Sequence, residues 1–275
     1  MVEIIDFDAM DEWAPSLAGA LSEHVPNDVQ ALIMAREPEF VEDARDILFD
    51  LGDRDAIIDA TLNWIRSSTV AGYHGSRLTE EEIASVREVG LLPLEAKARR
   101  VRLVRALSQH PRWDSVADQL EPELDAHGQG QRGGGREGQV HLTLSRSGLT
   151  NCFNHYLTHG SEFDQRVAHA LLGEEGEDLL ARDGTPIVLK FGVPGAVALK
   201  AAHPFCDITC MRDRGDVPNI VEEFLRAWSY SLAHPDFRSS SLRVDRGLLF
   251  RRSVRAEWLI AAESVPSLEV VSVLE

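Results

Sequence analysis

The residues 72–78, GYHGSRL, contain the side chains with the clearest capacity for chemistry. If this segment is a strand, its side chains alternate, so His74 and Ser76 face opposite to Tyr73 and Gly75. A glycine beside a histidine lets a flat polar ligand approach the backbone closely. His74 could then donate to a ribose hydroxyl while the backbone of Gly75 pairs with a carboxamide. The structural alternative is a buried histidine bonded to backbone beside a turn glycine.

A second polar group lies at residues 154–164, NHYLTHGSEFD. The ring of Tyr156 offers a stacking surface for a ligand. Ser161 precedes a helical pattern that has Glu162 in its first turn. Helix capping explains both of these residues without any ligand.

Glu257 interrupts the otherwise β-forming segment 253–261, SVRAEWLIA. On a strand it shares a face with Arg255 and Leu259. Because a carboxylate that is buried without a partner costs free energy, Glu257 is expected either to line a cleft or to point into solvent. An ion pair with Arg255 is the structural alternative.

The first of these segments has a clear positioning element after it. We expect a short strand at 71–78 and a helix at 80–89. Thr79 and Glu82 have the spacing of a capping box, in which each side chain bonds the backbone of the other. Gly90 then supplies a left-handed end to the helix.

Hydrophobic periodicity predicts the remaining elements. Helices are expected within 26–68 and at 94–109, 154–172 and 217–234, and strands at 139–145, 186–195, 247–252, 253–261 and 267–273. Residues 127–138 are rich in glycine but lack the Gly-Lys-Ser/Thr of a phosphate loop, so we expect a flexible loop. Helices in the first half and strands in the second predict an α+β fold, with a helical segment at 1–69 and a domain at 70–275.

Composition limits the classes of partner and site. The formal net charge of −17 opposes general binding to nucleic acid or to anionic membranes. No apolar run is long enough to span a membrane and the N-terminus has no signal-peptide pattern, so a soluble, cytoplasmic protein is expected. His203, Cys206 and Cys210 match no common zinc spacing, so no metal site is expected.

The segment 97–105, KARRVRLVR, is a local exception to the acidic balance. Its basic residues are Lys97, Arg99, Arg100, Arg102 and Arg105, around an apolar stripe of Val101, Val104 and Leu107. Two readings remain open: a solvated helix face or a patch that binds substrate.

Taken together, the segments resemble the ADP-ribosyltransferase superfamily. The resemblance is to the histidine-type branch, which poly-ADP-ribose polymerases share with many bacterial toxins. YHGSRLTEEEIASVREVGLLPL resembles the strand with His-Gly and a small hydroxyl residue, followed by a helix that ends in Gly-Leu. RAEWLIAAESVPSLEVVSV resembles the last catalytic segment, a strand with glutamate, a turn with proline and a final strand.

This resemblance implies a split antiparallel β-sheet with an NAD-binding cleft between its halves. It implies a mono-ADP-ribosyltransferase, a glycosyltransferase that uses NAD as substrate and moves ADP-ribose to a macromolecular acceptor, protein or nucleic acid. A toxin or phage-defence effector with an antitoxin or regulatory partner fits that expectation. The alternatives are an NAD glycohydrolase of the same fold and a non-catalytic binding module.

The resemblance also implies roles for particular residues. Glu257 and His74 would be catalytic, with the Glu257 carboxylate stabilising positive charge on the ribose. The NAD-binding residues would be Tyr73, His74, Gly75, Ser76, Arg77, Tyr156, Ser161 and Phe163, with Tyr156 or Phe163 stacking on nicotinamide.

Overall fold

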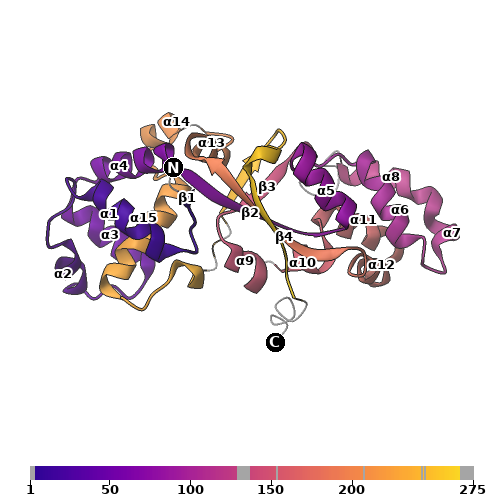
Figure 1. Ribbon diagram of the computed structural model, residues 1–275, viewed down its shortest axis with the longest axis horizontal. Coiled ribbons are helices and arrows are strands. Elements are labelled where there is room, and N and C mark those ends of the chain that lie inside the picture. The colour runs from indigo at the N-terminus through magenta and orange to yellow at the C-terminus, as the bar shows by residue number, and fades with distance from the viewer. Residues whose placement is uncertain are drawn as a thin grey trace. The chain divides into compact units, whose positions relative to one another are not determined.

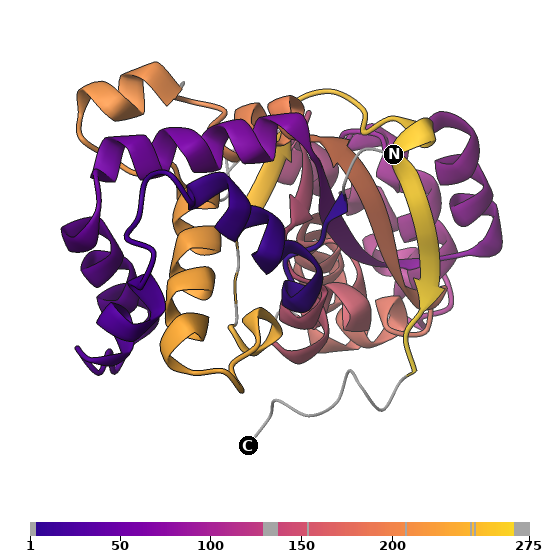
Figure 2. The ribbon, with the colours of Figure 1, turned by 60° about the vertical axis from the view of Figure 1, so that its left-hand side comes forward.

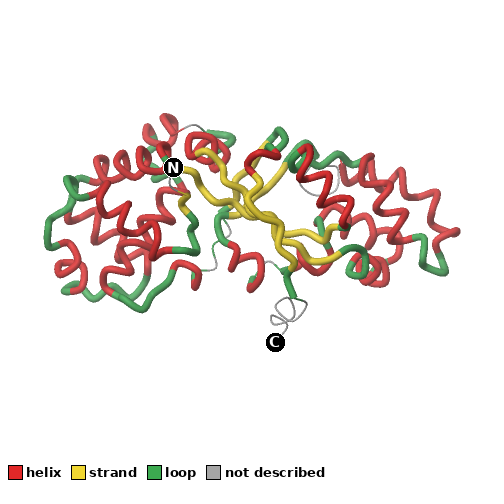
Figure 3. Tube along the Cα trace, in the orientation of Figure 1, coloured by secondary structure: helices red, strands yellow, loops and turns green. Residues whose placement is uncertain are grey.

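The computed structural model describes residues 4–128, 137–152, 154–206, 208–242, 244 and 246–266. Helices make up most of this part of the chain, and the strands form one six-stranded sheet (Figure 3). The predicted α+β class is therefore confirmed. No helix among the described residues is long and apolar enough to cross a membrane.

The chain folds into two compact units. Unit 1 contains residues 1–72, 143–148 and 192–248, and unit 2 contains residues 73–142, 149–191 and 249–275. The predicted helical segment 1–69 lies wholly in unit 1, and both units include residues of the predicted domain 70–275.

Unit 1 is mostly helical (Figure 1). Its helices are α1 (Met10–Leu21), α2 (Val29–Met34), α3 (Val41–Leu51), α4 (Arg54–Ser67), α13 (Gly195–Ala202), α14 (Ile208–Asp213) and α15 (Asn219–Ala233). Helix α15 packs against α2, α3 and α4, which brings residues far apart in sequence side by side (Figure 2). The rings of Trp13, Trp64 and Phe224 meet in the core, with Trp13 and Phe224 centroids 5.0 Å apart and edge to face.

The sheet is mixed. Its strands are β1 (Ile4–Ile5), β2 (Thr69–Leu78), β3 (Val140–Thr143), β4 (Thr185–Pro194), β5 (Gly247–Phe250) and β6 (Leu259–Ser264). The order is β5-β3-β2-β4-β6, with β1 also paired to β2. Strand β1 runs parallel to β2, and β4 runs antiparallel to β6. The predicted strand at 71–78 forms the larger part of the central strand β2, which is buried along most of its length.

Unit 2 contains further helices in addition to its strand residues. They are α5 (Glu80–Val89), α6 (Arg100–Leu107), α7 (Trp113–Val116), α8 (Leu120–Gly128), α10 (His155–His159), α11 (Glu162–Leu172) and α12 (Glu174–Leu180), while α9 (Arg146–Asn151) begins in unit 1 and ends in unit 2. Helix α11 packs against both α8 and α12. Its buried side chains Phe163, Val167 and Leu171 join Leu103 and Leu124 in one apolar core.

The boundaries of α5 follow from local chemistry, as predicted. The hydroxyl of Thr79 accepts from the amide of Glu82 at 3.2 Å, and the Glu82 carboxylate accepts from the amide of Thr79 at 2.8 Å. Gly90 has a φ of 83° and lies so close to Val254, which forms an isolated bridge with Leu91, that a Cβ would stand 2.1 Å from the Val254 carbonyl oxygen. Both the conformation and the close contact require glycine there.

Several predicted elements differ in the structure. The expected helix at 94–109 is a 3-10 turn at Lys97–Arg99 followed by α6. The expected helix at 154–172 is divided into α10 and α11, because Gly160 adopts a φ of 85° between them. The glycine-rich residues 129–136 and the final predicted strand at 267–273 lie outside the described residues.

Candidate functional site

His74 is half-buried on β2 and is held by the neighbouring strand. Its Nδ1 lies 2.9 Å from the backbone carbonyl oxygen of His141 on β3. A carbonyl only accepts, so Nδ1 must carry the proton and Nε2 of the neutral ring is an acceptor. Burial lowers the pKa of His74, and the charge of Arg99 lowers it further, so the neutral ring is favoured. The structural alternative correctly predicted the backbone bond, and the neutral ring offers a hydrogen-bond acceptor at Nε2 where a donor was expected.

The residues beside His74 are closed in by neighbours. A Cβ on Gly75 would stand 3.3 Å from the side chains of Leu149 and Leu157, so these leucines occupy the space that a flat ligand would need. Tyr73 is 3% exposed, with the Lys190 ammonium 5.7 Å from its ring centre. The buried hydroxyl of Ser76 lies 3.5 Å from the backbone carbonyl of the next residue. Tyr73, Gly75 and Ser76 are therefore buried, and their predicted contacts with NAD stay predictions.

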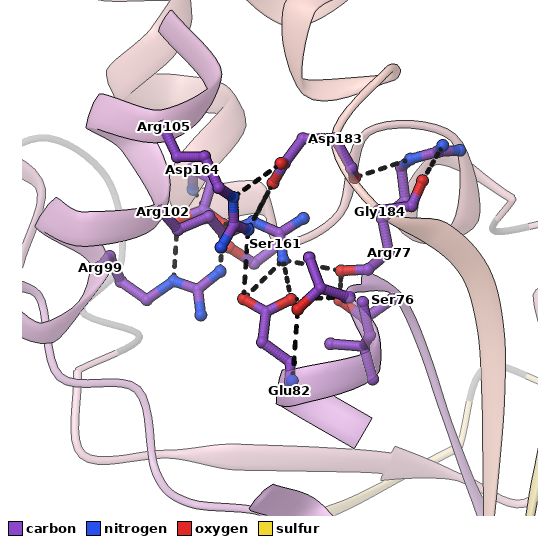
Figure 4. A network of polar contacts seen from close by, with 12 residues as sticks. Ser76, Arg77, Glu82, Arg99, Arg102, Arg105, Ser161, Asp164, Asp183 and Gly184 are labelled. Carbon is purple, nitrogen blue, oxygen red and sulfur yellow. Dashed lines mark hydrogen bonds and ion pairs between the residues drawn. The ribbon is translucent and has the colours of Figure 1, made fainter. Parts of the chain in front are cut away.

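Arg77, near the end of β2, directs its side chain toward backbone carbonyls of other segments (Figure 4). It donates to the backbone carbonyls of Asp183 at 3.2 Å, Gly184 at 2.6 Å and Leu157 at 3.3 Å. These three carbonyls belong to the turn before β4 and to α10. All three guanidinium nitrogens therefore join chain segments, which gives Arg77 a structural role, and its predicted contact with NAD stays a prediction.

Three further arginines on α6 and the turn before it reach into the same network. Figure 4 shows Arg99, Arg102 and Arg105 directed toward acidic side chains of other elements. Arg99 makes a two-point contact with Asp164, and Arg105 makes one with Asp183 at 2.8 and 2.9 Å. Two-point contacts of this kind are among the strongest that an arginine forms with a carboxylate.

Arg102 is the most deeply buried of these arginines, at 3% exposure. Its Nη1 donates to the backbone carbonyl of Arg77 at 2.7 Å and to Glu82 at 3.1 Å. Its Nε and Nη2 are buried without a hydrogen bond, although Nε lies 3.4 Å from an oxygen of Asp164. Glu82 therefore serves twice, as the cap of α5 and as the anchor of α6.

Asp164 is fully buried at the centre of this network. Burial by itself raises the pKa of a carboxyl, but the charge and hydrogen bonds of Arg99, with help from Arg102 and Ser161, outweigh it. They hold the pKa of Asp164 below its ordinary value. The residue is thus an anion that organises the surrounding cations.

These contacts bear on the two interpretations of the basic segment 97–105, a solvated helix face or a patch that binds substrate. Arg99, Arg102 and Arg105 neither point together into solvent nor form an open patch, because each is bound to a carboxylate of unit 2. The predicted apolar stripe is also only partly right, since Leu107 is fully buried while Val101 is 72% exposed.

The segment 154–164 is organised mainly by helix capping. Ser161 is the N-cap of α11, where its hydroxyl accepts from the amide of Asp164 at 3.1 Å. Phe163 is 4% exposed within the apolar core, where its ring packs against other side chains, and its expected role over nicotinamide stays a prediction. Tyr156 donates its hydroxyl hydrogen to Glu162 at 2.8 Å and lies against the ring of His155.

Glu257 is not on a strand, so the strand prediction for 253–261 is wrong at this point. Ala256–Trp258 is a 3-10 turn, and β6 begins only at Leu259. The Glu257 side chain is 65% exposed and accepts from Arg255 at 3.2 Å, which is the predicted structural alternative. The alternation that was expected to aim Glu257 into a cleft therefore does not apply.

The two predicted catalytic residues have different surroundings. Among the described residues, His74 and Glu257 share no hydrogen bond or ion pair: one bonds the backbone of β3 and the other bonds an exposed arginine. In the same part of the chain, no group of three His, Cys, Asp or Glu side chains is arranged to hold a metal ion.

The sequence analysis missed the acidic partners Asp164 and Asp183. A signal for Asp164 was present, because it lies between Phe163 and Val167 on the apolar face of a predicted helix. A carboxylate at such a position needs a cation. The arginine-rich segment 97–105 was the available source.

The comparisons with known proteins identify no relative: the chain matches no protein-family model, no curated protein and no solved structure.

Proposed function

We propose that this chain binds NAD and transfers its ADP-ribose group to an acceptor, as the resemblance to histidine-type ADP-ribosyltransferases implies. The elements of the first motif support the proposal. Strand β2 carries His74 and Gly75, the capped helix α5 follows, and Gly90 ends that helix as in the family pattern. The split-sheet arrangement of that family is part of the proposal.

The observation that carries the proposal is the fixed state of His74. Its Nδ1 proton is committed to the His141 carbonyl, so its Nε2 presents a lone pair on a rigid strand. A neutral imidazole held in this way can accept a hydrogen bond from a ribose hydroxyl. Holding the ring in one tautomer before the ligand arrives reduces the entropy lost on binding.

In the proposed reaction the bond between the ribose C1′ and the nicotinamide nitrogen breaks, and nicotinamide leaves with the electron pair. The acceptor nucleophile then bonds C1′ and releases its proton. The resemblance assigns the stabilising carboxylate to Glu257. Because an exposed carboxylate is strongly screened by water, this role requires that bound NAD exclude water from Glu257.

The first experiment measures NAD affinity by calorimetry for the parent protein, His74→Ala and His74→Gln. Alanine removes the acceptor and is expected to weaken binding about tenfold, the effect of losing one hydrogen bond that leaves its partner unpaired. Glutamine keeps an acceptor oxygen and should retain part of the affinity. Equal affinity of all three proteins would remove His74 from the NAD site.

A second experiment follows nicotinamide release by the parent protein and Glu257→Gln. If Glu257 stabilises the transition state, release should fall at least about a hundredfold, as when other charge-stabilising groups are removed. The melting temperature should hardly change, because an exposed ion pair contributes little to stability. Labelled ADP-ribose attached to a macromolecule would indicate transfer, and free ADP-ribose would indicate a glycohydrolase.

A non-catalytic binding module is the second candidate. The observations that favour it are the exposed, paired Glu257 and the leucines that cover Gly75. It predicts that the parent protein releases no nicotinamide and binds no NAD at millimolar concentration. Nicotinamide release by the parent protein would exclude it.

A further inference from the structure

Unit 2 carries a groove that the proposed NAD chemistry does not use. It has a volume of about 470 Å³ and lies where α8, α11 and α12 meet. Its lining is His127, Glu162, Gln165, Arg166, His169, Ala170 and Glu177. A volume of this size is within the range of small-molecule sites.

The groove follows the outer face of α11. Residues 162, 165, 166, 169 and 170 recur at helical spacing, while the opposite face of the helix is buried in the apolar core. From Glu162 to His169 is seven residues, or about 10 Å along the helix. His169 Nδ1 lies 3.0 Å from a carboxylate oxygen of Glu177, so carboxylates lie near both ends of this stretch.

His127 gives a second, independent indication of a ligand. Its side chain is 10% exposed, and both ring nitrogens are buried without a hydrogen bond. Its Nε2 lies 3.4 Å from a carboxylate oxygen of Glu123, which places the proton on that nitrogen and leaves Nδ1 as an acceptor. An acceptor that is buried without a donor costs free energy until something donates to it.

The charges of the lining indicate the kind of donor. Glu162 and Glu177 are opposed by one guanidinium, that of Arg166, which is 44% exposed and 3.8 Å from Glu162. Glu123 adds a further negative charge behind His127. Carboxylates therefore outnumber guanidinium groups at this groove, in a protein whose net charge is already −17.

We propose that this groove binds a linear aliphatic polyamine. Its ammonium groups would donate to Glu162, Glu177 and the free nitrogen of His127, and its alkyl segments would lie against Ala170. Spaced ammonium groups match carboxylates separated along one helix, which a single compact cation does not. This site is independent of the proposed transfer of ADP-ribose.

The test is calorimetric titration of the full-length protein with spermidine at low ionic strength. The variant Glu177→Gln removes one carboxylate of the groove, and Glu174→Gln is the matched control, since Glu174 is an exposed residue of the same helix outside the groove. We expect Glu177→Gln to weaken spermidine binding about tenfold and Glu174→Gln to leave it within about twofold. No measurable binding, or equal weakening in both variants, would overturn the proposal.

The variant His127→Phe separates binding from stability. Phenylalanine keeps the ring shape but has no polar atom to leave unpaired, so the free protein should be at least as stable as the parent. Its affinity for spermidine should nevertheless fall. If His127→Phe binds spermidine as tightly as the parent protein, His127 does not face the ligand and the proposed site is wrong.

Discussion

Asp164 in unit 2 and Glu223 in unit 1 are both buried carboxylates that contact arginines, yet their pKa values move in opposite directions. The pKa of Asp164 is lowered, whereas burial raises the pKa of Glu223 and its arginines do not compensate. Asp164 uses both carboxylate oxygens in its contact with Arg99 and has Arg102 beside it. At Glu223 both arginine hydrogen bonds reach one oxygen, from Arg246 at 2.7 Å and Arg226 at 3.4 Å.

The surroundings of the arginines add to this difference. Arg246 is 41% exposed, so water competes for its charge, and the neighbouring carboxylate of Glu222 repels Glu223. Arg102, in contrast, is 3% exposed. A nearby cation is therefore not sufficient to keep a buried carboxylate ionised. Two-point geometry and shielding from water decide whether the charge is held.

The largest expected effect is that of Asp164→Asn. This substitution leaves Arg99 and Arg102 without their buried anion, and breaking a buried pair from one side typically costs about 3–5 kcal/mol. Denaturant unfolding would measure the loss, with Asp178→Asn, an exposed substitution in the same unit, as the control. A loss below about 1 kcal/mol would show that the network of Figure 4 does not hold unit 2 together.

Glu223→Gln should have a smaller effect. Because burial raises the pKa of Glu223, its ionisation costs more free energy in the folded protein than in the unfolded chain, so replacement by an amide of the same shape should cost at most about 1 kcal/mol or stabilise slightly. The measurement is again denaturant unfolding at pH 7. A loss as large as that of Asp164→Asn would remove the contrast between the two carboxylates.

The pH dependence of stability should distinguish the same two residues. Because the folded-state pKa of Asp164 is depressed, its contribution is present above the ordinary aspartate pKa and is lost as the pH falls below it. Because the folded-state pKa of Glu223 is raised, its contribution is present below the ordinary glutamate pKa and is lost as the pH rises through the folded value.

The free energy of unfolding, measured against pH, should therefore show that Asp164→Asn flattens the acid side of the profile. Glu223→Gln should instead flatten the region just above the ordinary glutamate pKa, and profiles parallel to the parent's would contradict both assignments.

The smallest effect is expected for an exposed pair between α6, the helix of Arg102, and α8. Arg100 and Glu121 are 2.7 Å apart, but their side chains are 57% and 54% exposed. Glu121→Gln should change the free energy of unfolding by less than about 0.5 kcal/mol. A larger loss would mean that burial is not what separates these ion pairs in strength.

Local chemistry determined the elements that the sequence analysis predicted well. The capping box of Thr79 with Glu82 and the positive φ at Gly90 depend on groups within a few residues of one another. The same is true of the Ser161 cap. Such interactions do not require knowledge of the rest of the fold, so residue spacing is enough to predict them.

The tertiary structure alone decided what surrounds the candidate site. The groups to which the side chains of Arg77, Arg99 and Arg105 donate hydrogen bonds lie from 65 to 107 residues away in the chain, so no local pattern could pair them. The sequence analysis placed Glu257 on a strand because the residue types of 253–261 do not show where the 3-10 turn ends and β6 begins. Which side chains become buried depends on long-range packing, and burial in turn determines whether an arginine is a structural tie or a free ligand for an anion.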